Sequence, residues 1–241
     1  MSSTVAKTDS LKRLKSGRMK SKPPGRFVVL DGPDGAGKST QAKLLLEQLK
    51  AHGKTALLLR EPGGTDAGEA IRSLLLEKRK HDNLSALAET FLFQAARAQL
   101  IQEVIKPALA KGTWVICDRF TLSTLVYQGL AGGVKRETVE TLSALAADGV
   151  KPDRYMVLWL PAADAANRRT GRGTADRMES KGETFLKAVS QAYKTLAGKN
   201  DQYRRIDASG TVDEVRQRIW NEVESLIGKK SGSRNSRGKM K

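Results

Sequence analysis

The sequence predicts an α/β fold, in which a parallel sheet of about five strands is covered by helices on both faces. Short apolar runs alternate with longer amphipathic segments throughout residues 27–227, and no internal repeat or linker interrupts the alternation. Strands that alternate with helices in this way pair in parallel through right-handed crossovers. We therefore expect one domain over residues 27–227.

The expected strands are short apolar runs that end at turn-forming residues. Phe27 to Asp31 is rich in β-branched residues and is followed by Gly32, and the next run ends before Pro62-Gly63-Gly64. In chain order the five predicted strands cover residues 27–31, 55–60, 114–117, 155–160 and 205–208.

Three amphipathic segments predict helices at residues 38–52, 85–111 and 212–227. The first has Leu45 and Leu49 on its apolar face and stops at Gly53. The second has an apolar stripe of Phe93, Leu100, Ile101 and Val104, which Arg97 interrupts.

Most of the net charge of +17 lies outside this domain. Residues 1–26 contribute +7 and residues 228–241 contribute +6, and both segments are rich in Lys and Ser. Such segments cannot bury enough apolar surface to fold, so we expect two basic disordered tails. Because the excess charge lies in the tails, nucleic acid is expected to make only weak, non-specific contact with them.

The same composition excludes other classes. No apolar stretch is long enough to cross a membrane, and the N-terminus lacks the apolar region of a secretory signal. Cys117 is the only cysteine of the 241 residues, so no disulfide can form within the chain. A reducing, cytoplasmic location is expected.

A phosphate-binding loop is the most specific motif. Every fixed position of G-x-x-x-x-G-K-[ST] is matched, directly after a predicted strand and at the start of a predicted helix. Glycines let the backbone N–H groups surround phosphates, the lysine reaches the β- and γ-phosphates, and the hydroxyl suits Mg²⁺. The predicted ATP-binding residues are Gly32, Pro33, Asp34, Gly35, Ala36, Gly37, Lys38, Ser39 and Thr40.

Three further segments point to the second substrate. Residues 60–65 read Arg-Glu-Pro-Gly-Gly-Thr and end the second predicted strand, where open α/β sheets bind ligands. Phe93 and Arg97 share one helix face, although Arg97 could instead pair with Glu89 or Glu103 on the helix surface. Residues 118–119 read Asp-Arg and follow the third strand.

Together these segments resemble the thymidylate kinase family over about residues 26–227. The resemblance implies a P-loop kinase fold and transfer of the γ-phosphoryl group of ATP to dTMP with Mg²⁺, a step of dTTP biosynthesis. It also implies a homodimer, with the long helix near residues 85–111 at its interface.

The resemblance implies a role for each matching residue. Asp34 would bind the 3′-hydroxyl of dTMP, Arg60 and Arg119 would hold its 5′-phosphate, and Pro62 would form a turn whose peptide is often cis. Phe93 would stack on thymine and Arg97 would contact the base. At the sugar and the polar edge of the base, the implied residues are Tyr127 against the 2′ position, Ser123 or Thr124, and Gln128.

A lid is expected at residues 167–179, where arginines and glycines alternate. Residues 33–36 contain no arginine, so the chain resembles the branch of the family in which lid arginines assist transfer. Arg172 is the first candidate and Arg168 the second, beside Lys38 and Arg119 as catalytic residues. Ser39 and Asp118 are the expected metal ligands.

Two positions depart from the family pattern. Asp31 stands where glutamate is more usual, and Trp159 stands near a position that is acidic in many relatives. The alternatives are another nucleotide or deoxynucleoside kinase and, from a different class, a nucleic-acid-binding scaffold with a relict phosphate loop. The cluster of arginines favours an acceptor that carries a phosphate.

Overall fold

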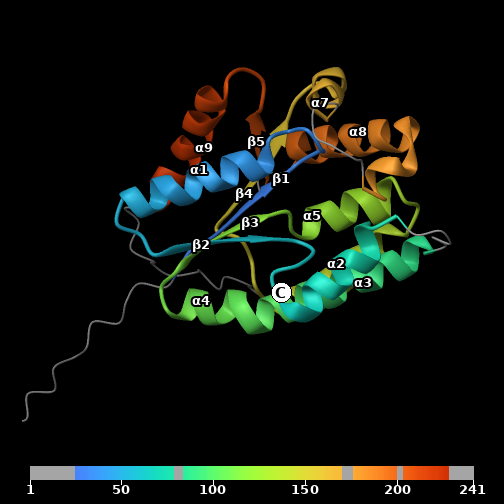
Figure 1. Ribbon diagram of the computed structural model, residues 1–241, viewed down its shortest axis with the longest axis horizontal. Helices are drawn as coiled ribbons and strands as arrows, with labels where there is room; N and C mark the ends of the chain where they lie inside the picture. The colour runs from blue at the N-terminus through green and yellow to red at the C-terminus, as the bar shows by residue number, and fades with distance from the viewer. Residues whose placement is uncertain (1–24, 79–83, 170–175, 200–202, 228–241) are drawn as a thin grey trace, which may run out of the picture.

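The computed structural model describes residues 25–78, 84–169, 176–199 and 203–227 (Figure 1). Five parallel strands form one sheet in the order β2-β3-β1-β4-β5, with helices on both faces. The predicted fold class is therefore confirmed. Except for residues 25 and 26, the two basic tails lie outside the described residues.

All five predicted strands are present, with small shifts at their ends. The strands are β1 (Phe27–Asp31), β2 (Ala56–Arg60), β3 (Trp114–Asp118), β4 (Arg154–Trp159) and β5 (Tyr203–Asp207). Every residue of β1 is buried, as expected for a central strand that is covered on both faces.

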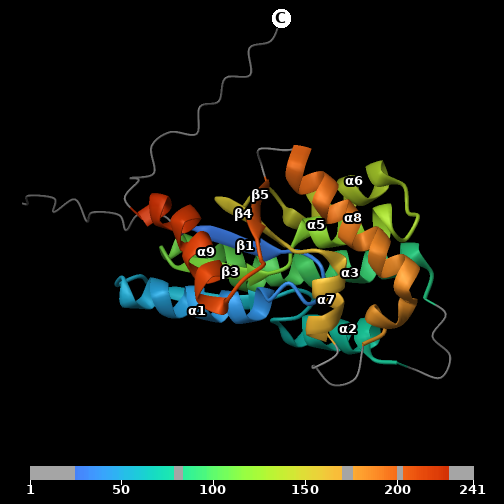
Figure 2. The same ribbon diagram turned by 90° about the horizontal axis from the view of Figure 1, so that it is seen from above.

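Two apolar clusters fill the space on the two sides of the sheet. Val28 and Leu30 point to one face, where α1 (Lys38–Ala51) and α9 (Val212–Ile227) pack. Phe27 and Val29 point to the other face, which is covered by α3 (Ala86–Leu100), α6 (Arg136–Ala147) and α8 (Glu183–Lys199). Figures 1 and 2 show these two helical layers.

The long helix predicted at 85–111 is present but irregular. It consists of α3, a π-helical segment η1 (Ile101–Ile105) and α4 (Lys106–Ala110), and Ser85 caps its start through a bond from the Ala88 amide. Pro107 has no N–H and cannot continue the i→i−4 ladder, which is a common cause of such an irregularity.

Several helices were not expected as separate elements. Besides α6 and α8 they are α2 (Asp66–Leu76), α5 (Thr121–Thr124), the π-helical η2 (Leu125–Leu130), α7 (Ala162–Arg169) and the 3₁₀ turn η3 (Glu179–Lys181). The end of α7 contains Arg168, so the first residues of the expected lid are helical. None of the described helices is long and apolar enough to span a membrane.

The strand order places the functional segments at one edge. β1 lies between β3 and β4, so the phosphate loop after β1 faces the residues that follow β3. Arg60 ends β2 beside Asp118 at the end of β3. Carboxyl ends of parallel strands are where open α/β sheets bind ligands.

Candidate active site

The phosphate loop has a backbone that only glycine accommodates easily. Gly32 has φ 139°, and a Cβ at this position would lie 2.2 Å from the carbonyl oxygen of Leu158. Gly37 is in the left-handed region at φ 86° and caps the N-terminus of α1; apart from its chain neighbours, no described residue has an atom within 4 Å of an added Cβ. The loop therefore packs closely on β4 at its start and opens α1 at its end.

Lys38 lies within this loop rather than on the surface. Its Nζ donates to the Pro33 carbonyl at 2.9 Å and lies 3.7 Å from the Asp34 carboxylate. Burial lowers the pKa of Lys38, and the nearby Arg119 guanidinium lowers it further.

A cavity of about 200 Å³ lies beside the loop. All the predicted substrate-binding residues and both predicted metal ligands line it: Asp34, Ser39, Arg60, Pro62, Phe93, Arg97, Asp118, Arg119, Ser123, Thr124, Tyr127 and Gln128. Lys38 lines it as well, whereas Thr40 is exposed in the first turn of α1. Residues that lie far apart in the sequence therefore line one cavity.

The two expected metal ligands are in contact. Ser39 Oγ donates to Asp118 Oδ2 at 2.5 Å, and the buried Asp118 Oδ1 has no hydrogen-bond partner among the residues that the structure describes. Hydroxyl and carboxylate oxygens are the donors that Mg²⁺ prefers, and Mg²⁺ commonly takes only one or two protein ligands beside phosphates and waters. No cluster of three His, Cys, Asp or Glu exists among the described residues. The pair therefore fits Mg²⁺ bound together with a nucleotide.

Arg97 is buried, with only 2% of its side chain exposed, and it does not pair with Glu89 or Glu103. Its partner is Glu61, which accepts from Nε at 2.8 Å and lies 2.6 Å from Nη2. Gln94 and Thr124 accept from the two terminal nitrogens at 2.6 and 3.1 Å. Glu61 lies within the Arg-Glu-Pro-Gly-Gly-Thr segment but is not among the predicted site residues.

The choice between Ser123 and Thr124 is clear from their hydroxyl partners. Ser123 Oγ donates to Asp31 at 2.7 Å and accepts from Arg119 at 3.0 Å. Thr124 instead contacts Arg97, at the end of the cavity where Phe93 lies half-buried. Of the two, Thr124 is therefore the one that contacts Arg97, while Ser123 contacts Arg119.

Gln128 is held at the same end by a second buried carboxylate. Its Nε2 donates to Glu89 at 3.3 Å, and Glu89 is 1% exposed. Glu89 also pairs with Arg177 at 2.8 Å and Lys181 at 2.9 Å. This cluster connects α3 with the end of the expected lid, through Arg177, and with Lys181 just after it.

Arg119 lines the cavity beside the phosphate loop. It is a non-glycine residue with φ 75°, so its backbone is strained. Its guanidinium pairs with Asp34 and donates to the Gly32 carbonyl at 3.2 Å. Tyr127 Oη donates to the other oxygen of Asp34 at 2.6 Å. Three segments therefore meet around Arg119.

Arg60 lines the cavity from β2 and is more exposed. Its Nη2 pairs with Glu69 at 2.8 Å, and the Glu61–Pro62 peptide that follows is cis, as the resemblance implied. Arg72 on α2 also lines the cavity and donates to the Pro62 carbonyl at 2.8 Å. Burial lowers the pKa of Arg72. No motif marked Arg72 as a site residue.

Asp31 is a further residue whose importance only the structure shows. It is fully buried, and its two oxygens accept from the hydroxyls of Tyr155, Tyr193 and Ser123 at 2.6–2.7 Å. The Gly32 amide donates to it at 2.9 Å. Aspartate is one methylene shorter than the glutamate that is more usual at this position, and both of its carboxylate oxygens still have hydrogen-bond donors.

The lid arginines are not brought into the cavity among the described residues. Arg168 donates to the carbonyls of Ala208 and Gly210 at 3.0 and 3.5 Å, and Arg172 lies outside the described residues. Asp176 and Met178, from the end of the expected lid, do line the cavity. Trp159 does not line it and is stacked instead by Arg205, 4.3 Å from its ring centre.

Comparisons with known proteins agree with this geometry. The thymidylate kinase family model matches residues 30–219. A thymidylate kinase of Rhizorhabdus wittichii is 43% identical over 207 residues, covering 85% of this chain and 99% of the relative. Those of Pseudomonas putida and Thermosipho africanus are 42% and 40% identical, covering 81% and 84% of this chain and 93% and 98% of the relatives. This chain therefore belongs to the thymidylate kinase family.

Proposed function

We propose that this chain transfers the γ-phosphoryl group of ATP to dTMP with Mg²⁺, giving ADP and dTDP. The observation that supports this most strongly is the set of side chains that line the cavity beside the phosphate loop. Lys38, Arg60 and Arg119 line it together with the aromatic ring of Phe93 and the hydrogen-bonding side chains of Thr124 and Gln128. A nucleoside monophosphate has the matching polarity, with a dianion at one end and a base at the other.

The phosphate end has groups for both nucleotides. Lys38 and the loop amides bind the β- and γ-phosphates of ATP, while Arg119 and Arg60 hold the 5′-phosphate of dTMP. A guanidinium presents two N–H groups to a phosphate, which fixes the acceptor in orientation as well as position. Arg72 lines the same region and adds positive charge.

The other end of the cavity suits thymine and deoxyribose. Phe93 stacks on the base, and Arg97, Thr124 and Gln128 bond its polar edge. Tyr127 and Asp34 face the sugar, Asp34 taking the 3′-hydroxyl and Tyr127 crowding the 2′ position. Their mutual hydrogen bond of 2.6 Å supports this placement, because it fixes both side chains before the sugar arrives.

Mg²⁺ belongs between the loop and β3, where Ser39 and the unpartnered Asp118 Oδ1 provide oxygen ligands. When bound, the ion offsets negative charge on the β- and γ-phosphates. The protein contributes the Ser39 hydroxyl and the Asp118 carboxylate, whose Oδ1 is buried.

The chemical step needs positioning and charge compensation more than proton transfer. An oxygen of the dTMP phosphate attacks the γ-phosphorus, the bond to the β–γ bridging oxygen breaks, and ADP leaves. No general base is required, because the acceptor oxygen is already ionised. Lys38 and a lid arginine, Arg172 before Arg168, stabilise the charge of the transferred group.

The test is an ADP-release assay with ATP and Mg²⁺ that compares dTMP, dUMP, dCMP, dGMP, UMP and thymidine as acceptors. A strong preference for dTMP is expected. Turnover with thymidine but not dTMP would contradict the phosphate role of Arg60 and Arg119. Tight ATP binding without turnover of any acceptor would favour the scaffold alternative.

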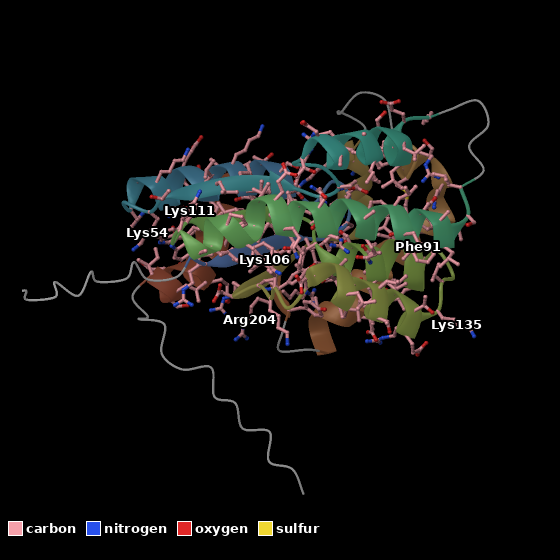
Figure 3. All side chains as sticks on the ribbon, turned by 90° about the horizontal axis from the view of Figure 1, so that it is seen from below. Lys54, Phe91, Lys106, Lys111, Lys135 and Arg204 are labelled. Atoms are coloured by element: carbon pink, nitrogen blue, oxygen red, sulfur yellow. The ribbon has the colours of Figure 1, made fainter. Side chains whose placement is uncertain are left out.

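The proposal includes a homodimer formed through α3. Leu87 and Phe91 lie on this helix with 45% and 53% of their surface exposed, and Figure 3 shows Phe91 on the outer side of α3. Exposed large apolar side chains on one helix are typical of an interface. Light scattering after size-exclusion chromatography should give twice the mass of 26.3 kDa, and Phe91→Glu should give the monomer mass.

We also propose that the enzyme is cytoplasmic and that its two basic tails are not needed for activity. A cytoplasmic enzyme is supported by the single thiol of Cys117, which is free and buried. Removal of residues 1–25 and 229–241 should leave kinase activity unchanged and abolish any salt-sensitive binding to nucleic acid. Loss of activity on this truncation would contradict the assignment of the tails as dispensable.

A further inference from the structure

The Asp31 carboxylate organises a buried cluster directly behind Arg119. Asp31 Oδ1 accepts from Tyr193 Oη at 2.6 Å and Ser123 Oγ at 2.7 Å, and Arg119 Nη1 lies 3.8 Å from the same oxygen. The cluster therefore connects the residue before the phosphate loop with the residues after β3.

Tyr193 links this cluster to a distant part of the chain. It lies on α8, after the expected lid, and is fully buried. Its hydroxyl lies 2.9 Å from Ser123 Oγ and accepts from Arg119 Nη1 at 3.4 Å. Burial, followed by the charge of Asp31, raises the pKa of Tyr193, so the hydroxyl keeps its proton and remains a donor to Asp31.

The geometry points to Tyr193 as a positioning residue: with Asp31 and Ser123 it holds the Arg119 guanidinium in the orientation that receives the acceptor phosphate. This rests on the role of Arg119 in the proposed function. Because Arg119 already has a strained backbone, its side chain needs fixed partners on more than one side. Arg119 Nη2 donates to Asp34, whereas Nη1 donates to the Gly32 carbonyl and to the hydroxyls of Ser123 and Tyr193.

Tyr155 offers a matched control. It is equally buried and its hydroxyl donates to the other oxygen of Asp31 at 2.7 Å, but its own acceptor bond is from the Leu122 amide. No bond from Tyr155 to Arg119 is present in the described structure. The two tyrosines thus share Asp31 and differ in whether they touch the arginine.

The experiment compares Tyr193→Phe with Tyr155→Phe by calorimetric binding of dTMP and of thymidine to the full chain, with kcat and KM measured in parallel. Each change removes one oxygen. Tyr193→Phe should weaken dTMP binding about tenfold, which is the usual size for a hydrogen bond in a charged network. It should leave thymidine binding and the KM for ATP within about twofold. Tyr155→Phe should leave both acceptor affinities unchanged and lower only the unfolding temperature.

A double-mutant cycle tests whether the effect passes through Arg119. In an Arg119→Ala background, Tyr193→Phe should cause no further loss of dTMP affinity. A full additional loss, or equal losses for dTMP and thymidine in the single variant, would overturn the positioning role. A wild-type chain that binds thymidine as tightly as dTMP would overturn the phosphate role of Arg119 itself, and this is measured before any variant.

Discussion

The buried pair of Glu61 and Arg97 gives the sharpest prediction on stability. Their side chains are 4% and 2% exposed, and Glu61 accepts two contacts from the guanidinium at 2.6–2.8 Å. Burial raises the pKa of Glu61, while Arg97 acts to lower it, so each charge depends on the other for its place in the interior.

Glu61→Gln keeps the size of the side chain but removes its charge. Loss of one partner from a buried ion pair costs about 3–5 kcal/mol, because the remaining charge is left uncompensated. The amide oxygen of glutamine can still accept one hydrogen bond, so we expect the lower end, about 3 kcal/mol. For a chain of this size, that loss lowers Tm by about 6–12 °C.

Urea unfolding followed by far-UV circular dichroism measures the effect. The matched control is Glu140→Gln, which breaks the Arg136–Glu140 pair whose side chains are 53% and 48% exposed. This change should alter stability by less than about 0.5 kcal/mol. A loss below about 1 kcal/mol for Glu61→Gln would refute the reasoning. The double variant Glu61→Leu/Arg97→Met should recover most of the loss, because neither charge of this pair remains buried.

Three further predictions concern the site and its surroundings. Lys38→Ala should abolish phosphoryl transfer while far-UV circular dichroism stays native, and an active, folded variant would remove Lys38 from the mechanism. Gly32→Ala places a Cβ 2.2 Å from the Leu158 carbonyl and should lose about 2 kcal/mol or more of stability in urea, whereas Gly53→Ala, at φ 70° in open space, should lose about 1 kcal/mol. Burial raises the pKa of the Cys117 thiol, so a thiol reagent should label it only as the chain unfolds; rapid labelling of the native chain would contradict its burial.

The fold was predictable because its main features are local patterns. Apolar runs marked the first four strands, whereas β5 reads Tyr-Arg-Arg-Ile-Asp and was placed before the last helix. The first and last helices have almost the expected bounds. The helices α6 and α8 were missed as separate elements, and α7 was assigned in part to the lid. Glycines flank both helices, Gly149 after α6 and Gly182 before α8, so the sequence does contain boundary signals for them.

The site was predictable to the extent that it consists of motifs. Glycines determine the backbone conformation of the phosphate loop. The resemblance implied that Arg60, Phe93 and Arg119 belong to one site, and all three line the cavity. The partners of these residues were not predictable. Glu89 and Glu103 are the acidic neighbours of Arg97 along its helix, yet Arg97 pairs with Glu61 from another segment.

The sequence by itself thus determined the five strands, the first and last helices, the phosphate loop and the residue types that meet at the carboxyl edge of the sheet. Only the tertiary structure decided which side chains hold them in place: Glu61 for Arg97, Glu89 for Gln128, and Asp31 with Tyr193 for Arg119. The physical reason is that helix and strand periodicity acts over a few residues. A buried charge instead takes whichever partner the packed chain brings within reach, and Asp31 and Tyr193 are 162 positions apart.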